Sequence, residues 1–356
     1  IGDGEETIIE ICNKLEKKVS LGGTLGIAHR VNNKIIIEQP RPLLDNLDEL
    51  PFPNRELGIR RLYVKSHVSR GVSRKFLNVM EVLIARGCPY QCIFCATHLT
   101  YKRRVRYRSL DNVFQEIKMN IERYGINHVE ILDDTFTLHK GMVKDFCNRI
   151  KELGISWSCE TRLDHVDQEM LDMMAESGLL KISFGVESGS QRILDLVKKE
   201  ITVKQIIEGF RMARKSGIKL VEGTFMIASH IDETEDDVNE TIKLIKKIKP
   251  DIISVSILTP LPGTETFRIM KEKGFIFAED WDKFTYVGGL PTWRTTYFTP
   301  KDLVRLQKKV LMSIYLNPGY LLRMIRKVKS VDEFKYWFDI GFDFIRRFVF
   351  PIKTYS

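Results

Sequence analysis

The feature that most constrains the fold is a regular alternation of short apolar runs and longer amphipathic stretches across residues 78–275. Each apolar run has the length of a buried strand, and each amphipathic stretch repeats its apolar residues with a helical period. Parallel strands require such helical crossovers, and their carboxyl ends form the edge where ligands bind. Strands are expected at residues 79–85, 128–132, 156–160, 181–186, 219–227 and 252–258.

Helices are expected between these strands, and several of them end at a glycine that opens the next strand, as helices often do. Six successive strand–helix units predict an α/β fold, a partial (β/α)6 barrel over residues 78–275. The helical stretches are residues 109–124, 140–153, 167–177, 191–197 with 203–216, and 233–248.

Two smaller segments flank the predicted barrel. Residues 1–53 are too short for a stable core of their own, and their proline-rich end indicates an extended linker, followed by a connector at residues 54–77. Residues 276–356 combine an irregular segment with a helical extension. The amino-terminal elements are a helix at 7–18 and strands near 25–30 and 34–38; the carboxy-terminal helices are 301–316, 320–329 and 331–350, with a break at 317–319.

The net charge of +9 comes mainly from the carboxy-terminal extension. Residues 301–356 hold 12 Lys and Arg against 5 Asp and Glu, together with 11 of the 35 aromatic residues. Aromatic residues at helical spacing beside basic ones indicate either an interfacial helix on an anionic membrane or a cap that packs on the barrel. No apolar run approaches the roughly 18 residues of a spanning helix. Nucleic acid is not an expected partner, because no recognition-module signature occurs.

A second basic run, residues 102–108, follows closely on a group of cysteines. It is either a solvated loop or a surface that binds an anion or faces the substrate.

Three of the six cysteines, Cys88, Cys92 and Cys95, fall within eight residues directly after the first predicted strand. The six are too few for a disulfide scaffold, which favours a reducing cytoplasm. The three clustered thiols can hold structural zinc with His98 as a fourth ligand, or an iron–sulfur cubane with one open iron, unless they are an incidental group. Their position at the ligand-binding edge of a large sheet favours the cluster, because zinc knuckles usually staple small units.

The Cys-x3-Cys-x2-Cys spacing, with the aromatic Phe94 before the last cysteine, resembles the radical S-adenosylmethionine (SAM) superfamily over residues 78–275. The resemblance implies an oxygen-sensitive [4Fe–4S] cluster on Cys88, Cys92 and Cys95, whose open iron chelates the amino and carboxylate groups of SAM. It also implies that an electron donor such as a ferredoxin or flavodoxin reduces the cluster. SAM then splits into methionine and a 5′-deoxyadenosyl radical, which abstracts hydrogen from an unactivated position.

The resemblance places further SAM contacts at the ends of successive strands. Asp133 and Asp134 follow the second strand and are expected to hold the amino nitrogen, with helix capping as the alternative. Glu187 and Ser188 follow the fourth strand and are expected to contact the ribose.

Two further strand ends are less typical of the superfamily. Arg162 follows the third strand and could meet the SAM carboxylate or form a surface ion pair. Ala228 and His230 follow the fifth strand where related sequences carry glycine, so their side chains could crowd the approach to adenine.

Residues 4–7, 26–28 and 47–53 resemble the end of a cobalamin-binding domain and its linker, as found in the cobalamin-dependent radical SAM class. The Asp-x-His-x-x-Gly motif that carries the cobalt ligand in that class does not occur in this chain, and the chain begins at Ile1 without a methionine. We therefore expect an amino-terminal remnant of that domain, with cobalamin bound only if an upstream domain is present.

The sequence thus predicts a cytoplasmic radical SAM enzyme with possible peripheral membrane contact through its carboxy-terminal helix. The first expectation is methyl transfer to an unactivated carbon of a small hydrophobic or lipid-like substrate. The alternative reaction is radical cyclisation or oxidation of a lipid or isoprenoid, and the non-enzymatic alternative is a zinc-stapled binding module.

Overall fold

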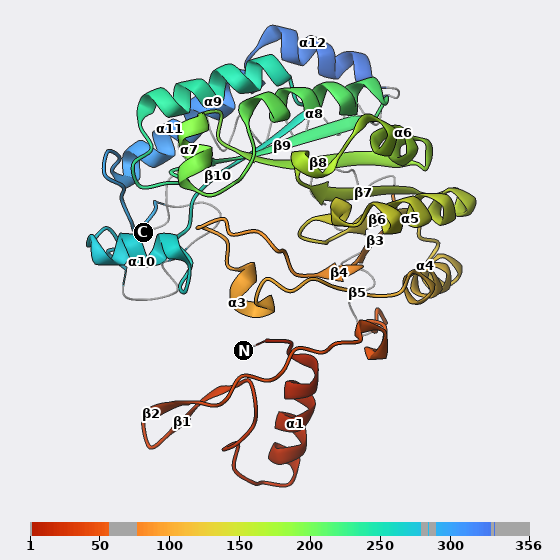
Figure 1. The fold of residues 1–356 in the computed structure, drawn as a ribbon, viewed down its shortest axis with the longest axis vertical. Helices are drawn as coiled ribbons and strands as arrows, with labels where there is room; N and C mark the ends of the chain where they lie inside the picture. Colours follow the sequence, from red (N-terminus) through yellow and green to blue (C-terminus); the bar gives the residue numbers. More distant parts are fainter. Residues whose placement is uncertain (1, 57–76, 279–283, 285–289, 329–330, 332–356) are drawn as a thin grey trace.

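The computed structural model describes residues 2–56, 77–278, 284, 290–328 and 331 (Figure 1). Six parallel strands form one sheet whose spatial order follows the chain, with β3 at one edge and β10 at the other. Because these two edge strands do not pair with each other, the barrel is open, which confirms the predicted partial (β/α)6 architecture. The strands are β3 (Val79–Val82), β6 (His128–Ile131), β7 (Ser156–Thr161), β8 (Leu179–Glu187), β9 (Leu220–Ile227) and β10 (Ile252–Ile257).

Helices cover the outer face of this sheet (Figure 1). Their ends follow local sequence rules: the Ser109 side chain accepts a hydrogen bond from the amide of Asn112 at the start of α4, and Gly125 ends that helix in a left-handed conformation. The helices are α4 (Leu110–Tyr124), α5 (Lys140–Leu153), α6 (Gln168–Glu176), α7 (Gln191–Leu196), α8 (Val203–Lys215), α9 (Glu235–Ile248) and α10 (Glu265–Glu272).

The two faces of the sheet differ in chemistry. The outward face packs on the helices through an aromatic cluster in which Phe136, Phe146 and Trp157 meet edge to face. The opposite face carries buried polar side chains: Glu222 accepts hydrogen bonds from Lys181 at 3.1 Å and from the Ser183 hydroxyl at 2.6 Å. Alternation along each strand therefore separates an apolar outer core from a polar interior.

The first strand of the sheet is shorter than predicted: the sequence predicted residues 79–85, whereas β3 covers Val79–Val82. β3 ends at Val82, and the chain leaves the sheet because Oδ1 of Asp133 accepts hydrogen bonds from the amides of Ile84 and Ala85 at 2.8 and 3.0 Å. A separate antiparallel ribbon follows, in which β4 (Ala85–Arg86) pairs with β5 (Arg106–Tyr107), with the short helix α3 (Thr97–Tyr101) between them.

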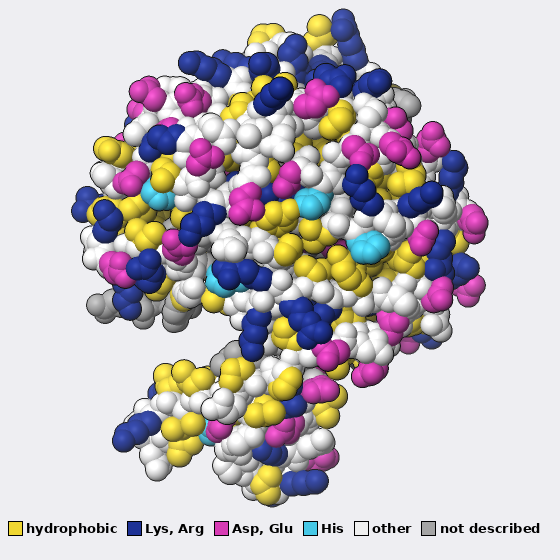
Figure 2. All heavy atoms as spheres, viewed as in Figure 1, with side chains coloured by type: hydrophobic (Ala, Val, Ile, Leu, Met, Phe, Trp, Pro, Cys, Tyr) yellow, Lys and Arg dark blue, Asp and Glu magenta, His cyan; other side chains and the backbone are white. Residues whose placement is uncertain are grey.

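The amino-terminal residues form a small unit beside this ribbon. A buried ion pair joins the two bodies, because the Arg106 guanidinium contacts both carboxylate oxygens of Asp3, which also pairs with Arg86 at 3.2 Å. Figure 2 shows the surface hollowed between this unit and the barrel. The unit consists of α1 (Glu5–Glu16), the hairpin β1 (Ala28–Val31) with β2 (Lys34–Ile37), and the 3-10 turn η1 (Leu47–Glu49).

At the other end, α11 (Pro300–Tyr315) lies against β10 and α9, and α12 (Pro318–Lys327) follows it. The predicted break at residues 317–319 is wrong in part, because Asn317 caps α12 and Pro318 occupies its first turn, where a missing amide is tolerated. The predicted helix at 331–350 lies outside the described residues except for Val331, as does most of the predicted connector. Within the described ranges, no helix is long and apolar enough to cross a membrane.

Candidate active site

The three clustered cysteines lie on a loop that leaves β4 at the carboxyl edge of the sheet. All three are free thiols of intermediate burial. Backbone hydrogen bonds hold the loop in place, since the Ile93 amide donates to the Val197 carbonyl at 3.2 Å and the Thr266 amide donates to the Ile93 carbonyl at 3.1 Å. The loop is therefore tied to segments that follow β8 and β10.

Gly87 allows this loop to reach its position. Its φ of +104° is one that residues with a side chain rarely adopt, and a Cβ added there would lie 2.1 Å from the Arg104 carbonyl oxygen. The cysteine loop and the turn at residues 102–104 are thus in direct backbone contact, which only glycine permits.

Burial raises the pKa of the Cys88 and Cys92 thiols. At Cys92 the positive charges of Lys199 and Arg162 act in the opposite direction and favour the thiolate. Glu187 adds to the rise, and each cation has a carboxylate partner, Glu187 for Lys199 and Asp164 for Arg162. A metal centre binds thiolate rather than thiol, so metal ligation would displace the proton that burial favours on these thiols.

The structure does not assemble the alternative zinc site. Nδ1 of His98 lies 2.9 Å from the Cys95 carbonyl oxygen, and no three His, Cys, Asp or Glu side chains in the described ranges are arranged to hold a single metal ion. A cubane binds each cysteine to a different iron, so its ligands need not converge on one point. Three soft donors on one loop are the donor set that such a cluster requires.

Arg162 lies beside the cysteine loop and is buried. It forms a bidentate pair with Asp164, with both nitrogen–oxygen distances at 2.9 Å, and its guanidinium stacks 3.5 Å from the ring centre of Tyr90, which lies between Cys88 and Cys92. The ion pair predicted as one alternative therefore exists, but it is buried rather than on the surface.

Glu187 reaches the site through a β-bulge. The register between β8 and β9 shifts between Gly185 and Glu187, and Glu187 has a φ of +67°. Bulges redirect side chains at strand ends. Here the bulge accompanies a buried ion pair in which Oε1 of Glu187 accepts a hydrogen bond from Nζ of Lys199 at 2.8 Å.

Ser188 lies next to Glu187 but makes different contacts. Its side chain is fully buried, and its hydroxyl lies 3.3 Å from that of Thr241 and accepts a hydrogen bond from the Ser190 amide. In this structure the hydroxyl therefore holds the loop after β8 against α9.

The two aspartates after β6 occupy different environments. Asp133 is buried, which raises the pKa of its carboxyl to about 7 although two amides donate to Oδ1. Its Oδ2 is buried and has no hydrogen-bond partner among the described residues. Asp134 is exposed at the surface and accepts hydrogen bonds from the Thr97 hydroxyl and the Gly87 amide, so it borders the start of the cysteine loop.

Ala228 has a φ of +58°, a left-handed conformation that glycine adopts with less strain. The turn is held by Glu233, whose carboxyl accepts hydrogen bonds from the amides of Ala228 and Ser229 and is fully buried. Burial raises the pKa of Glu233 to about 8. The turn thus keeps the shape of a glycine turn although the residue is alanine.

Sequence reasoning missed three residues of this site: Tyr90, Lys199 and Glu233. Tyr90 could have been found, because it lies inside the cysteine motif. Lys199 stands in a charged Lys-Lys-Glu run that is typical of a solvated surface, and Glu233 precedes a helix as many acidic residues do. Only burial in the folded structure distinguishes Lys199 and Glu233 from ordinary charged residues at the surface.

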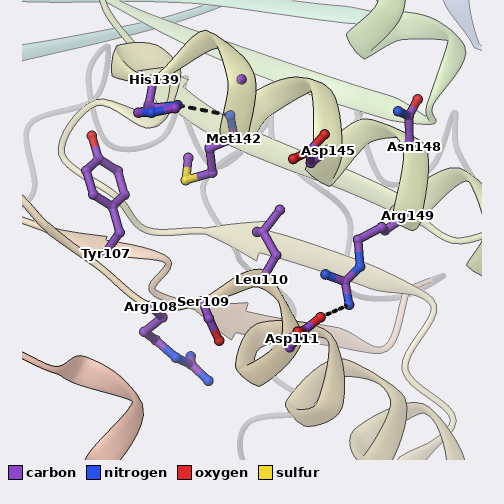
Figure 3. A pocket seen from close by; sticks show the side chains of 11 residues that line it. Tyr107, Arg108, Ser109, Leu110, Asp111, His139, Met142, Asp145, Asn148 and Arg149 are labelled. Carbon is purple, nitrogen blue, oxygen red and sulfur yellow. Dashed lines mark hydrogen bonds and ion pairs between the residues drawn. The ribbon is translucent and has the colours of Figure 1, made fainter.

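Two grooves lie outside this cysteine-loop site. One of about 730 Å³ lies beside the first turns of α4 and α5, where Arg149 pairs with Asp111 at 2.9 Å and His139 caps α5 (Figure 3). The other, of about 900 Å³, is lined largely by apolar side chains of α1, the linker and β3. Neither groove is lined by the cysteines or by any predicted SAM contact.

The family model described as Radical SAM superfamily matches residues 82–245. An uncharacterized methyltransferase of Pyrococcus horikoshii is 35% identical over 326 residues, which cover 91% of this chain and 68% of that protein. The chain belongs to the radical SAM superfamily. The recognition made from the cysteine spacing is confirmed. Because radical SAM proteins are enzymes that use a [4Fe–4S] cluster and SAM, the family also decides against the non-enzymatic alternative, a zinc-stapled binding module.

Other radical SAM relatives are more distant. The anaerobic magnesium-protoporphyrin IX monomethyl ester cyclase of Rubrivivax gelatinosus is 25% identical over 294 residues, covering 80% of this chain and 51% of that protein. The cytidylyl-2-hydroxyethylphosphonate methyltransferase of Streptomyces wedmorensis is 27% identical over 309 residues, which cover 79% of this chain and 58% of that protein. This radical SAM chain spans between about half and two thirds of the length of these relatives.

Solved structures share the fold. OxsB, a cobalamin-dependent SAM radical enzyme with aqua-cobalamin and SAM bound, matches with a TM-score of 0.67 at 17% identity, over 100% of this chain and 57% of that chain. The radical SAM methyltransferase TsrM from Kitasatospora setae matches with a TM-score of 0.59 at 18% identity, over 76% of this chain and 53% of that chain. At such low identity these likenesses confirm the partial barrel.

Proposed function

We propose that Cys88, Cys92 and Cys95 hold the [4Fe–4S] cluster of this radical SAM enzyme. The observation that carries the proposal is three free, partly buried thiols on one tethered loop at the carboxyl edge of the sheet. When bound and reduced, the cluster supplies the electron that cleaves SAM into methionine and a 5′-deoxyadenosyl radical. The protein orients the reactants and excludes water around that chemistry.

The side chains around the loop are proposed to hold SAM. Arg162 and Lys199 supply positive charge for its carboxylate, and Asp134, beside Gly87, supplies negative charge for its amino group. Glu187, already oriented by Lys199, is placed to accept hydrogen bonds from ribose hydroxyls. Asp133, Ser188 and Ala228 are proposed to complete the same edge, and the contacts of Asp133 and Ser188 support a positioning role.

For the reaction, we propose methyl transfer to an unactivated carbon of a small-molecule substrate. The relatives named as methyltransferases in Pyrococcus horikoshii and Streptomyces wedmorensis support it. The second candidate is radical cyclisation, which the named cyclase of Rubrivivax gelatinosus supports. A lipid-like substrate and peripheral membrane contact rest on residues 331–356, outside the described part of the chain except for Val331. We propose that cobalamin binds only where an upstream domain is present.

The cluster assignment is tested by anaerobic reconstitution of the wild-type chain and of Cys88→Ala, followed by iron and acid-labile sulfide analysis. Cys12→Ala is the matched control, because Cys12 is an exposed free cysteine on α1. We expect Cys88→Ala to lose the cluster and the production of 5′-deoxyadenosine from SAM and dithionite, with the control unchanged. Zinc without sulfide in the wild-type chain would overturn the proposal.

The two reactions differ in the fate of SAM. A SAM molecule that donates its methyl group becomes S-adenosylhomocysteine. A SAM molecule that is cleaved to generate the radical becomes methionine and 5′-deoxyadenosine. With the full-length protein and substrate present, both adenosyl products together support methyl transfer, and 5′-deoxyadenosine alone supports cyclisation.

A further inference from the structure

The basic run at residues 102–108 is only partly a solvated loop. Arg106 is buried against Asp3, and Arg108 pairs with the buried carboxylate of Glu116 at 2.7 Å, so both have structural partners. The remaining three basic residues of the run, Lys102, Arg103 and Arg104, are exposed and form what we call the basic turn.

The basic turn has a defined backbone. Lys102 and Arg103 are consecutive left-handed residues with φ of +50° and +59°, and the Lys102 amide donates to the His98 carbonyl at 2.9 Å to end α3. The Arg104 amide donates to the Tyr101 carbonyl at 2.8 Å. Two successive left-handed residues with side chains are strained, and such strain is found at functional segments. The turn therefore has a defined backbone from which its cationic side chains extend.

These cations are available to a partner. Among the described residues, neither Lys102 nor Arg103 has an acidic group within 4 Å, and Arg104 pairs only with the highly exposed Asp45. Exposed pairs of this kind are weak and easily exchanged. On the side of the barrel where Figure 1 places α3, Figure 2 shows Lys and Arg side chains gathered along the hollow. The surface is thus a local concentration of positive charge.

The basic turn also lies directly against the cysteine loop. The Arg104 carbonyl oxygen is the atom that a Cβ on Gly87 would approach to 2.1 Å, and Gly87 precedes Cys88. A protein that docks on the turn therefore meets a segment whose backbone touches the residue before the first cysteine. Electron carriers use small, charge-steered interfaces of this type.

We propose that the basic turn docks an acidic one-electron carrier protein of the flavodoxin or ferredoxin class, which reduces the cluster through the adjacent cysteine loop. This proposal rests on the proposed function of Cys88, Cys92 and Cys95. The reduced carrier loses one electron and the oxidised cluster gains one, and no covalent bond forms or breaks. Positive charge beside the cluster loop gives the encounter its orientation and speed.

The test uses a double charge reversal, Lys102→Glu with Arg103→Glu, and a milder Lys102→Gln with Arg103→Gln. The matched control is Lys243→Glu with Lys247→Glu on the outer helix α9, where both lysines are exposed. The first readout is the dissociation constant for oxidised flavodoxin, measured by microscale thermophoresis at low and high salt. The second is reduction of the loaded cluster by flavodoxin or by dithionite, followed optically.

We expect the charge reversal to raise the dissociation constant at low salt about tenfold or more, the Gln variant to raise it less, and the control to change it little. Dithionite is expected to reduce the cluster equally in all variants. Unchanged flavodoxin binding in the charge reversal would overturn the docking proposal, as would an equal loss in the control. Tight binding of pyrophosphate at the turn without flavodoxin binding would also overturn it, in favour of an anionic substrate.

The proposed function fails in a distinguishable way. If the wild-type chain binds no iron and sulfide, or dithionite does not reduce its cluster, the cluster assignment is wrong whatever the turn binds.

Discussion

Replacing Gly87 by alanine tests whether the cysteine loop depends on its contact with the basic turn. The new Cβ would lie 2.1 Å from the Arg104 carbonyl oxygen, whereas real Cβ contacts essentially never fall under 3.0 Å, so one backbone must move by about 0.9 Å. Overpacking of this kind costs about 1–3 kcal/mol. The φ of +104° adds a strain of about 1–3 kcal/mol for a residue with a side chain.

The combined cost of about 2–6 kcal/mol is comparable with the stability of a whole domain, about 5–15 kcal/mol. We expect the cysteine loop to be the side that moves, because it has no strand or helix of its own between Gly87 and Ala96 and is held by the backbone hydrogen bonds of Ile93. We therefore expect Gly87→Ala to fold but to lose most of its bound iron and sulfide.

The assay compares iron and acid-labile sulfide per chain after anaerobic reconstitution, together with thermal unfolding by circular dichroism. Gly154→Ala is the matched control, because Gly154 ends α5 with a φ of +64° but has no atom within 4 Å of an added Cβ. It should lose about 1 kcal/mol of stability and keep its cluster. A full cluster in Gly87→Ala would refute the reasoning that this contact positions the cysteines.

Three further predictions follow from the buried groups of the site. Ala228→Gly should stabilise the chain by up to about 1 kcal/mol in denaturant titrations, because it relieves left-handed strain; a lower midpoint would contradict this. The raised pKa of Glu233, about 8, means that the folded state retains a proton that the unfolded state releases near 4.5, so stability falls as pH rises through that window. Glu233→Gln should flatten this dependence in thermal unfolding measured against pH. Lys199→Met should weaken SAM binding about tenfold or more in equilibrium dialysis, whereas Lys198→Met, which removes only a surface pair, should leave it unchanged.

The polar side chains in the barrel interior are paired with one another. Lys181 and Glu222 form a buried ion pair on the face of the sheet opposite the helices, and His128 contacts the hydroxyls of Ser156 and Ser158 at 2.8 and 3.0 Å. These contacts satisfy polar groups that the sheet buries, as buried polar groups in proteins generally require.

The sequence alone determined the features that depend on order and spacing along the chain. Strand and helix periods predicted the six-unit barrel, and the cysteine spacing with Phe94 identified the superfamily, because each signal is contained in a few neighbouring residues. The limits of the first strand were not predictable in this way, since the hydrogen bonds that end β3 come from Asp133, about fifty residues away.

The tertiary structure decided which charged residues near the cysteine loop are buried and paired. Lys199 appears along the sequence as an ordinary surface residue, and the resemblance that points to Arg162 and Glu187 does not show that both are held in buried ion pairs. Their burial, the bulge that accompanies the Glu187–Lys199 pair, and the contact between Gly87 and Arg104 arise only when distant segments pack together. The energy of a charge depends on its solvent exposure and its neighbours, and neither property is contained in residue spacing.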